Sequence, residues 1–542
     1  MDLMKELRDR IPAYAGVCFF SAFAAGLLTH LYVLTNKLPN WDDISNIDKP
    51  GAMNDFGRWF LRFVQPWISS YSVPALKGVV TIALLSLTAV LVLRALELRS
   101  MTSAVLIGVT MTTFPAVTSG MLFMFTVASY SVAVLFAGAA VFCTLRRRFG
   151  WIPGAVLLCF CLGIYQAYLP FAVSVFLIAV QLRILRGAPL REVLRTAFRE
   201  ALALGGGLAG YLAMLSRYQL SDYRGISSVG KTAPADFLEA FLRAYHRILQ
   251  YFVTEPMSYT SGFQHALHLL LLPLIALLLL RLTARRRLPE RPATAAALAL
   301  TVFLTPLGMS LVYLMAPEVT NASTLMIFSY MTVYFLAAGL AELCAGEAAA
   351  PAAPAPFSRT QRPARSRSRR SSGAGAGARL TRLSGLAFPC ILPAAAALIV
   401  LLIACSNYRM ANEAYFRTGL AFQRVSSYYE RIISRLEGEG GWNYGERYAI
   451  AGDFWPEKNI LSSYDLLEGR FADLEGLAIE NGLFTSGVRR DFIRSYLGID
   501  APYASEEEYE AILASGEFAE MAAYPEEGCV RQIDGIWVVK IR

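Results

Sequence analysis

The sequence predicts a polytopic α-helical membrane protein of about eleven transmembrane helices, followed by a small α+β domain. Three observations lead to this fold class. Apolar segments long enough to cross a bilayer follow one another along most of the chain. Clusters of arginine separate these segments. The final stretch is instead acidic, and it ends in two short apolar runs joined by Asp534-Gly535, which is typical of a β-hairpin.

The composition excludes a soluble enzyme of ordinary type. Of the 542 residues, 55% are hydrophobic, and the mean hydropathy is +0.44. The net charge of +9 comes from arginine clusters between apolar segments, so it indicates membrane orientation. No basic and aromatic surface for nucleic acid is evident. The positive-inside bias predicts a cytoplasmic N-terminus and an extracytoplasmic C-terminus.

The spans are predicted from apolar length and from the arginine clusters. A tight turn is expected at Ser119-Gly120, between the third and fourth spans. Residues 151–185 are too long for one helix, and Pro170 favours a break at residues 165–170. The predicted spans are 14–34, 73–93, 102–118, 121–145, two short spans within 151–185, then 201–215, 263–280, 293–315, 322–343 and 386–404.

Four domains follow from these spans. Residues 1–343 form a transmembrane module with outer loops 35–72 and 216–262, and residues 234–252 of the second loop have the pattern of an amphipathic helix. Residues 344–384, rich in Ala, Pro, Ser, Gly and Arg, are predicted to be a disordered, basic cytoplasmic linker. Residues 385–405 form the last span, and residues 406–542 form the extracytoplasmic domain.

The C-terminal domain is predicted to contain both helices and strands. Helices are expected at 411–436 and 465–480, a strand at 447–451, and a hairpin at 530–541. No catalytic constellation is evident in this domain. A module that binds a partner or acceptor, or that stabilises the protein, is the simpler interpretation.

The first outer loop carries the strongest functional signal. Asp42 and Asp43 form an adjacent carboxylate pair, and Pro50-Gly51 follows as a break. Next comes an amphipathic segment that suits the membrane interface. The alternative is an ordinary polar loop in which Asp43 caps a short helix. The amphipathic segment after Gly51 has aromatic and apolar side chains on one side, namely Met53, Phe56, Phe60, Phe63 and Trp67. Arg58 and Arg62 lie on another side.

Charged residues are almost absent from the centres of the predicted spans. An ion-coupled transporter needs such groups at mid-depth. The sequence also has no phosphate-binding loop, nucleophile elbow or paired-histidine zinc helix. These features favour chemistry at the outer surface. The polar residues within spans lie near their outer ends, where they could converge: His30, Lys77, Gln166, His265 and His268.

Several short motifs resemble a known family. They are Trp41-Asp42-Asp43, Gly57-Arg58-Trp59, Tyr165-Gln166-Ala167-Tyr168, and the C-terminal Ala523-Tyr524-Pro525 with 536–540. Their order and topology resemble the bacterial glucosyltransferases that modify O-antigen and other surface polymers, within the GT-C class of membrane glycosyltransferases.

The resemblance implies transfer of a sugar, commonly glucose, from a polyprenyl-phosphate donor to a cell-surface glycan at the outer leaflet of the bacterial cytoplasmic membrane. It also implies partner enzymes that make and flip the donor. An acidic residue of the first outer loop is essential in such enzymes, so this role falls to Asp42 or Asp43. Because neighbours on an extended chain point in opposite directions, one is expected to face the acceptor hydroxyl. The other would hold the loop or a metal, Mg²⁺ or Mn²⁺, which two ligands alone do not require.

The expected reaction is direct displacement at the anomeric carbon, with an aspartate as general base. Cations would neutralise the departing lipid phosphate, and aromatic and amide side chains would line the substrate pocket. The phosphate-binding candidates are Arg58, Arg62, Arg224 and Lys231, and the pocket candidates are Trp41, Trp59, Tyr165, Gln166 and Tyr168.

Three alternatives remain open. A related lipid-linked transferase could act on protein, teichoic acid or another wall glycan. A flippase or transporter of lipid-linked sugars would also suit uncharged span centres. A surface scaffold with a partner-binding C-terminal domain is the third.

Overall fold

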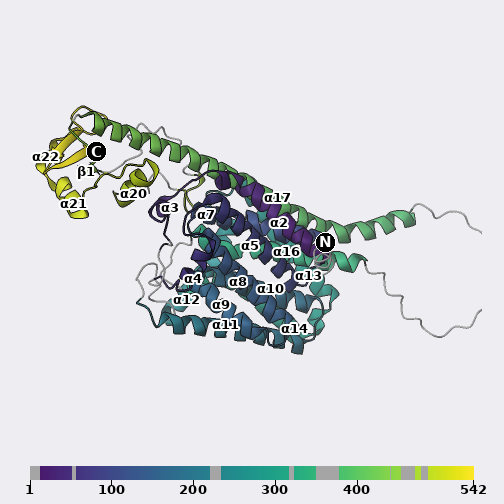
Figure 1. Ribbon diagram of the computed structural model, residues 1–542. Coiled ribbons are helices and arrows are strands. Elements are labelled where there is room, and N and C mark those ends of the chain that lie inside the picture. The colour runs from purple at the N-terminus through teal and green to yellow at the C-terminus, as the bar shows by residue number, and fades with distance from the viewer. Residues whose placement is uncertain are drawn as a thin grey trace, which may run out of the picture.

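The chain forms a helical bundle from which one long helix leads to a small sheet domain (Figure 1). This computed structural model describes residues 12–49, 51, 56–219, 234–315, 323–349, 377–439, 441–452, 470–477 and 486–541. Within these ranges, nine helical segments are long and apolar enough to cross a membrane. The predicted class, a polytopic helical membrane protein, is therefore confirmed, and the total of eleven spans stays a prediction.

The bundle is built mainly from the following helices, given in chain order. They are α2 (Ala13–Thr35), α5 (Pro74–Ala95), α6 (Met101–Thr113), α7 (Pro115–Leu122), α8 (Val127–Arg146), α9 (Trp151–Ile164), α10 (Leu169–Leu185), α11 (Leu190–Leu215), α13 (Gly262–Arg285), α14 (Pro292–Met309), α16 (Thr332–Ala349) and α17 (Gly377–Gly438). Short helices connect them: α3 (Trp41–Ser45), η1 (Gln166–Tyr168), α4 (Leu61–Ile68), α12 (Pro234–Leu249), η3 (Gln250–Thr254), η4 (Leu288–Glu290), α15 (Val312–Met315) and η5 (Thr324–Met331).

The break predicted within residues 151–185 is confirmed. Helix α9 ends at Ile164, and Tyr165 is extended, with φ −156° and ψ 116°. Pro170 then sits in the first turn of α10, where its missing N–H costs no helical hydrogen bond. The backbone polar groups at the break lie inside the bundle, since Tyr165 and Tyr168 are both buried.

The turn predicted at Ser119-Gly120 is wrong. Pro115 begins α7 directly after an extended Phe114, so α6 and α7 together make one kinked span that continues to Leu122. Ser119 and Gly120 are buried inside α7, and the chain turns at residues 123–126. Because the turn lies at residues 123–126, the N–H groups of Met124 and Phe125 lie at the end of the bundle that carries α3. We name this end the α3 end.

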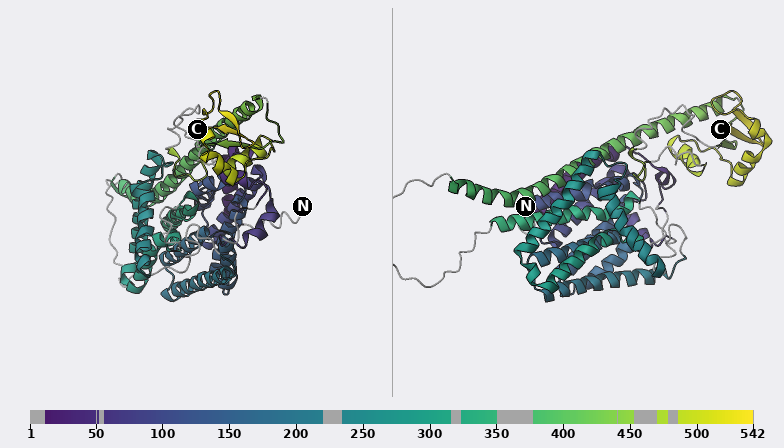
Figure 2. Two further views of the ribbon diagram at one scale, coloured as in Figure 1. Left: turned by 90° about the vertical axis from the view of Figure 1, so that its left-hand side faces the viewer. Right: turned by 180° about the vertical axis from the view of Figure 1, so that it is seen from behind.

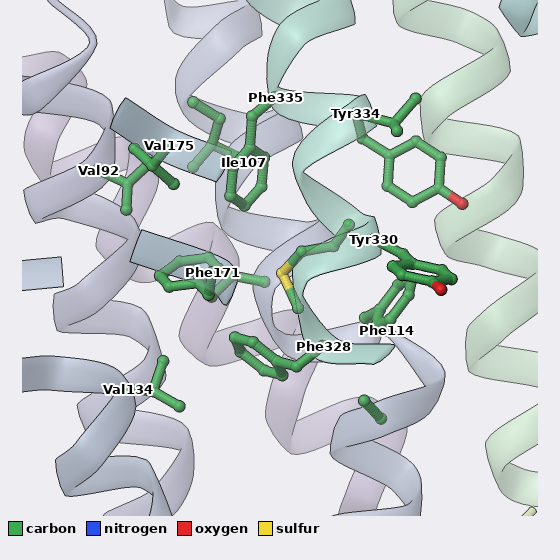
Figure 3. Packing of buried hydrophobic residues seen from close by; sticks show 14 of the residues in the cluster. Val92, Ile107, Phe114, Val134, Phe171, Val175, Phe328, Tyr330, Tyr334 and Phe335 are labelled. Carbon is green, nitrogen blue, oxygen red and sulfur yellow. The ribbon is translucent and has the colours of Figure 1, made fainter. Parts of the chain in front are cut away.

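The interior of the bundle is packed with aliphatic and aromatic side chains (Figure 3). Phe171 of α10 contacts both Phe328 of η5 and Phe335 of α16, with ring centroids 5.3 Å and 6.4 Å apart. The predicted amphipathic helix of the second outer loop is observed as α12 followed by η3, and Tyr245 packs on Phe303 of α14. Residues 220–233 of that loop lie outside the described ranges.

Arginines gather at the end of the bundle opposite α3. Glu97, after α5, forms ion pairs with Arg146 of α8, Arg183 of α10 and Arg186, at 3.2, 3.3 and 3.8 Å. Arginines from two of the predicted cytoplasmic clusters, 146–148 and 183–199, therefore meet at one carboxylate. This grouping agrees with the predicted alternation of the spans.

Helix α17 unites two predicted elements. The span expected at 386–404 and the helix expected at 411–436 are parts of one 62-residue helix. It runs along the bundle and continues beyond it to the sheet (Figures 1 and 2). The predicted disordered linker, 344–384, is helical at both ends, in α16 and α17, and its residues 350–376 lie outside the described part of the chain.

The C-terminal domain contains a three-stranded sheet in the order β1-β3-β2. Strand β1 (Tyr448–Ala451) is parallel to β3 (Ile536–Lys540), and β2 (Val530–Ile533) is antiparallel to β3. The predicted hairpin is confirmed, since Asp534 and Gly535 adopt φ of 48° and 79° at its turn. Helices α20 (Ser486–Tyr496), α21 (Glu506–Ala514) and α22 (Gly516–Glu520) complete the described part of the domain.

The helix predicted at 465–480 is wrong over its described part, 470–477. Beyond Arg470 these residues form turns. Phe471, Leu474 and Leu477 are 2%, 2% and 6% exposed, and they belong to the core of the transmembrane bundle. Their spacing of three suits a helix, but burial in the bundle determines their conformation instead. We name residues 470–477 the inserted segment.

Close packing of α9 on α11 depends on Gly207. A Cβ at this position would lie 2.7 Å from the Cβ of Leu158, whereas a Cβ at Gly205 would have no heavy atom within 4 Å. We expect Gly207→Leu to lower the free energy of unfolding by about 1–3 kcal/mol through overpacking, and Gly205→Leu to leave it nearly unchanged. Thermal unfolding of the detergent-solubilised protein measures the difference. Equal unfolding temperatures for the two variants would contradict the observed packing.

Candidate functional site

Helix α3 places Asp42 and Asp43 on different faces. Its N-cap is Asn40, whose side-chain oxygen accepts a hydrogen bond from the Asp43 N–H at 2.9 Å and whose amide donates to Leu122 O at 2.8 Å. The expectation of an extended chain here is wrong, and so is the alternative in which Asp43 is the cap. Adjacent helical residues still diverge by about 100° around the axis.

Asp43 is fully buried, and its carboxylate accepts four hydrogen bonds. The donors are the Phe125 N–H at 2.7 Å, the Met124 N–H at 3.3 Å, the Ser72 hydroxyl at 2.9 Å and the Lys37 ammonium at 3.3 Å. Burial lowers the pKa of Lys37, and the Asp43 charge opposes that shift. Asp43 thus joins the first loop to the turn between α7 and α8.

Asp42 faces a different environment. Its side chain is half-buried, and it interacts electrostatically with Tyr130 in the first turn of α8. Arg58 and Glu475 act on the same tyrosine. Two carboxylates, one guanidinium and a phenol therefore gather at the α3 end.

Arg58 lies over three aromatic rings. Its guanidinium carbon is 5.2 Å from the centroid of Tyr165, 5.8 Å from Tyr130 and 5.7 Å from Phe56. Tyr165 stacks on Tyr130 with centroids 4.4 Å apart and an interplanar angle of 9°. Tyr168 meets both Tyr165 and Phe328 of η5 edge-on. Cation–π contacts of this kind hold a guanidinium in place against the ring faces.

Gln166 joins two motifs that lie far apart in sequence. Its amide donates to Phe56 O at 3.0 Å and to the Tyr211 hydroxyl at 2.7 Å. Gly57 has φ +70°, and a Cβ there would lie 2.6 Å from the Tyr211 hydroxyl. Only glycine suits this left-handed, crowded position. The motif containing Arg58 is therefore fixed against the turn between α9 and α10.

Other predicted residues lie apart from this cluster. Trp59 is 5% exposed and packs on Phe160 of α9, and Trp41 contacts Phe123 edge-on. Arg62 is exposed on α4, with its guanidinium 4.8 Å from the ring of Phe63. Arg224 and Lys231 lie outside the described residues.

The polar residues near span ends mostly bond within the bundle. His30 is fully buried between the Tyr415 hydroxyl of α17, at 2.7 Å, and Thr112 O, at 2.9 Å. Lys77 donates to Phe125 O at 2.5 Å. His268 bonds the Tyr334 hydroxyl at 2.8 Å. Among these candidates and within the described residues, Gln166 is the one that bonds the segment 56–60 around Arg58, which we name the Arg58 loop.

The carboxylates do not form a metal site in the described ranges, where no group of three or more His, Cys, Asp or Glu side chains could hold an ion. The donor set explains why Asp43 does not fit Mg²⁺ or Mn²⁺. Its oxygens already accept four hydrogen bonds, one of them from a cation.

Sequence reasoning missed Tyr130 and Glu475. Tyr130 occurs in an apolar span with no local pattern to mark it. Glu475 belongs to the inserted segment, which reaches the bundle through a hydrogen bond from the Ser119 hydroxyl to Glu475 O at 2.6 Å. Neither position is detectable without the tertiary packing.

Comparison with known proteins gives a match over the membrane module. Residues 31–336 match the family model described as Glucosyl transferase GtrII. Searches of curated proteins and of solved structures found no match. The matched residues include α3, the Arg58 loop and the turn at Gln166.

The position of Asp43 predicts a structural role. We expect Asp43→Asn to lower the free energy of unfolding by about 1–3 kcal/mol, because an amide cannot satisfy all four donors. Thermal unfolding in detergent is the measurement, with Asp48→Asn as the control at an exposed site in the same loop. An Asp43→Asn protein that unfolds at the wild-type temperature would refute this role.

Proposed function

The chain belongs to the GtrII family of glucosyl transferases, and we propose that it transfers glucose from a polyprenyl-phosphate donor to a cell-surface glycan. The proposed location is the outer leaflet of a bacterial cytoplasmic membrane. The observation that carries the proposal is the gathering of Asp42, Arg58 and the tyrosine rings at one end of a membrane-spanning bundle. A general base beside a fixed cation is what displacement of a lipid phosphate requires.

The proposed orientation has the α3 end outside. The ion pairs of Glu97 with Arg146, Arg183 and Arg186 support it, because they collect arginines at the opposite end. By this topology the N-terminus is cytoplasmic, the C-terminal domain is extracytoplasmic, and the linker 344–384 is cytoplasmic. Enzymes that synthesise and flip the donor would act before this one.

Asp42 is the proposed general base. The Asp43 carboxylate is occupied by backbone, hydroxyl and ammonium donors, so it has little capacity to accept a substrate proton. Asp42 is half-buried and lies near Arg58. A carboxylate in such a position can receive a proton while the surrounding dipoles stay in place.

The proposed reaction is a single displacement. The acceptor hydroxyl oxygen attacks the anomeric carbon of glucose, and its proton passes to Asp42. The bond between that carbon and the phosphate oxygen breaks, and the phosphate leaves with the electron pair. Arg58 neutralises the charge that develops on the phosphate. Arg62, Arg224 and Lys231 remain candidates for the same task.

Family membership favours transfer over the transport of lipid-linked sugars. Transport needs two states of access, whereas transfer needs a base and a leaving-group site. The cluster of Asp42, Arg58 and Tyr130 supplies the latter.

Asp42→Asn tests the base directly. We expect sugar transfer in membranes to fall about 10²–10⁴-fold, the range for loss of a general base, with an unchanged unfolding temperature. Asp48→Asn is the matched control, since Asp48 is exposed in the same loop. Wild-type transfer by Asp42→Asn would eliminate the proposed base.

Arg58→Gln tests the cation. Removal of one preorganised charge-stabilising group is expected to lower the transfer rate about 10²–10³-fold. Arg62→Gln should cost much less, because Arg62 is exposed over its neighbour Phe63. The measurement is kcat with polyprenyl-phosphate glucose. Equal losses in the two variants would show that Arg58 has no special role.

A further inference from the structure

A cavity of about 360 Å³ opens between η3, η5 and the inserted segment. Its polar lining includes Arg247, Gln250, Glu255 and Asp473, and its aromatic lining includes Tyr251 and Tyr330. The volume lies in the lower part of the range of about 300–1,000 Å³ for small-molecule sites. None of these residues belongs to the motifs of the first outer loop.

The polar groups of the cavity are held by one another and by the backbone. Arg247 donates to the Gln250 side-chain oxygen at 3.0 Å, and the Gln250 amide donates to Glu255 at 2.7 Å. Asp473 accepts from the Ser258 N–H at 2.7 Å, while its own N–H donates to the Ser258 hydroxyl at 2.9 Å. The inserted segment is therefore fixed where its carboxylate faces the cavity.

The aromatic side of the cavity contains an unsatisfied hydroxyl. Tyr251 and Tyr330 meet edge-on, with centroids 5.2 Å apart. The Tyr330 hydroxyl bonds Ser310 at 2.9 Å. Tyr251 is only 4% exposed, yet its hydroxyl has no hydrogen-bond partner among the described residues. A buried hydroxyl of this kind costs free energy until a ligand or water satisfies it.

The charge balance selects the class of ligand. Two carboxylates and one guanidinium line the cavity, so a phosphate would meet more negative than positive charge. An uncharged, hydroxyl-rich ring suits the lining better. Its hydroxyls can donate to Asp473 and Glu255, and its apolar face can lie on tyrosine.

The cavity adjoins the Asp42 cluster through two segments. Asp473 lines the cavity, and Glu475, two residues later, interacts with Tyr130. Similarly, Phe328 contacts Tyr168, and Tyr330, two residues later, lines the cavity. A sugar bound here would lie two residues along each segment from side chains that interact with Tyr130 and Tyr168.

We propose that this cavity binds a hexopyranose of the transfer reaction, with Asp473 and Tyr251 as its hydrogen-bonding groups, an inference that rests on the proposed function. The ring belongs either to the glucosyl donor or to the acceptor glycan, which share this chemistry. Through Asp473, the C-terminal domain completes a site otherwise built by the bundle.

The test measures sugar binding to the full-length protein in nanodiscs by saturation-transfer difference NMR. The probes are methyl glucopyranoside, for the donor sugar, and surface glycan extracted from cells that lack this gene, for the acceptor. Asp473→Asn and Tyr251→Phe should each weaken binding of one probe roughly tenfold, the effect of losing one hydrogen bond to a ligand. Tyr259→Phe, at a tyrosine equally buried but outside the cavity lining, should bind normally.

Each outcome decides the proposal. Weaker binding of methyl glucopyranoside alone identifies the donor sugar, and weaker binding of the glycan alone identifies the acceptor. Unchanged binding of both probes by both variants, or no binding by the wild type, overturns the proposal. Asp42→Asn should bind both probes while it fails to transfer. A wild-type protein that binds sugar in the cavity but transfers none would defeat the proposed function and leave the cavity assignment intact.

Discussion

The Asp43 carboxylate accepts hydrogen bonds from the backbone N–H groups of Met124 and Phe125, and it is buried with the Lys37 ammonium and the Ser72 hydroxyl around it. Removing such a charge from water costs several kcal/mol unless its partners are complete. The partners come from the first loop, from the start of α5 and from the turn before α8. These three pieces of chain are therefore held to one another by a single buried carboxylate.

Around this fixed point, α3 acts as a junction. Trp41 packs on Phe123 of the bundle, while Ile44 belongs to the core of the C-terminal domain. Asp42 is left on the face toward Tyr130 and Arg58. One short helix thus positions the carboxylate proposed as general base and connects the bundle to the sheet domain.

Much of the fold could be predicted because apolar length and proline position act locally. Pro170 fixes the break after α9, and Asp534-Gly535 fixes the hairpin. Other boundaries could not. Residues 405–410 contain no proline or glycine that would end a helix. They also have no apolar periodicity that would predict the continuation of α17. The periodicity around Phe471 and Leu474 fits a helix, but burial in the bundle outweighs that preference.

The sequence motifs of the candidate site could be predicted, but the contacts between their side chains could not. Asp42, Arg58 and Gln166 could be chosen from short patterns, since each lies in a polar break between apolar runs. Which of the two aspartates is left to act as the proposed base depends on the hydrogen-bond donors around Asp43. Those donors are brought together by long-range packing. The order of the chain has a further consequence for biosynthesis. Every candidate membrane span in the described part of the chain is translated before residues 470–477, so a nascent bundle can insert while it still lacks Asp473 and Glu475. If the proposed function holds, the capacity for sugar transfer would arise last, once the C-terminal domain has emerged and docked.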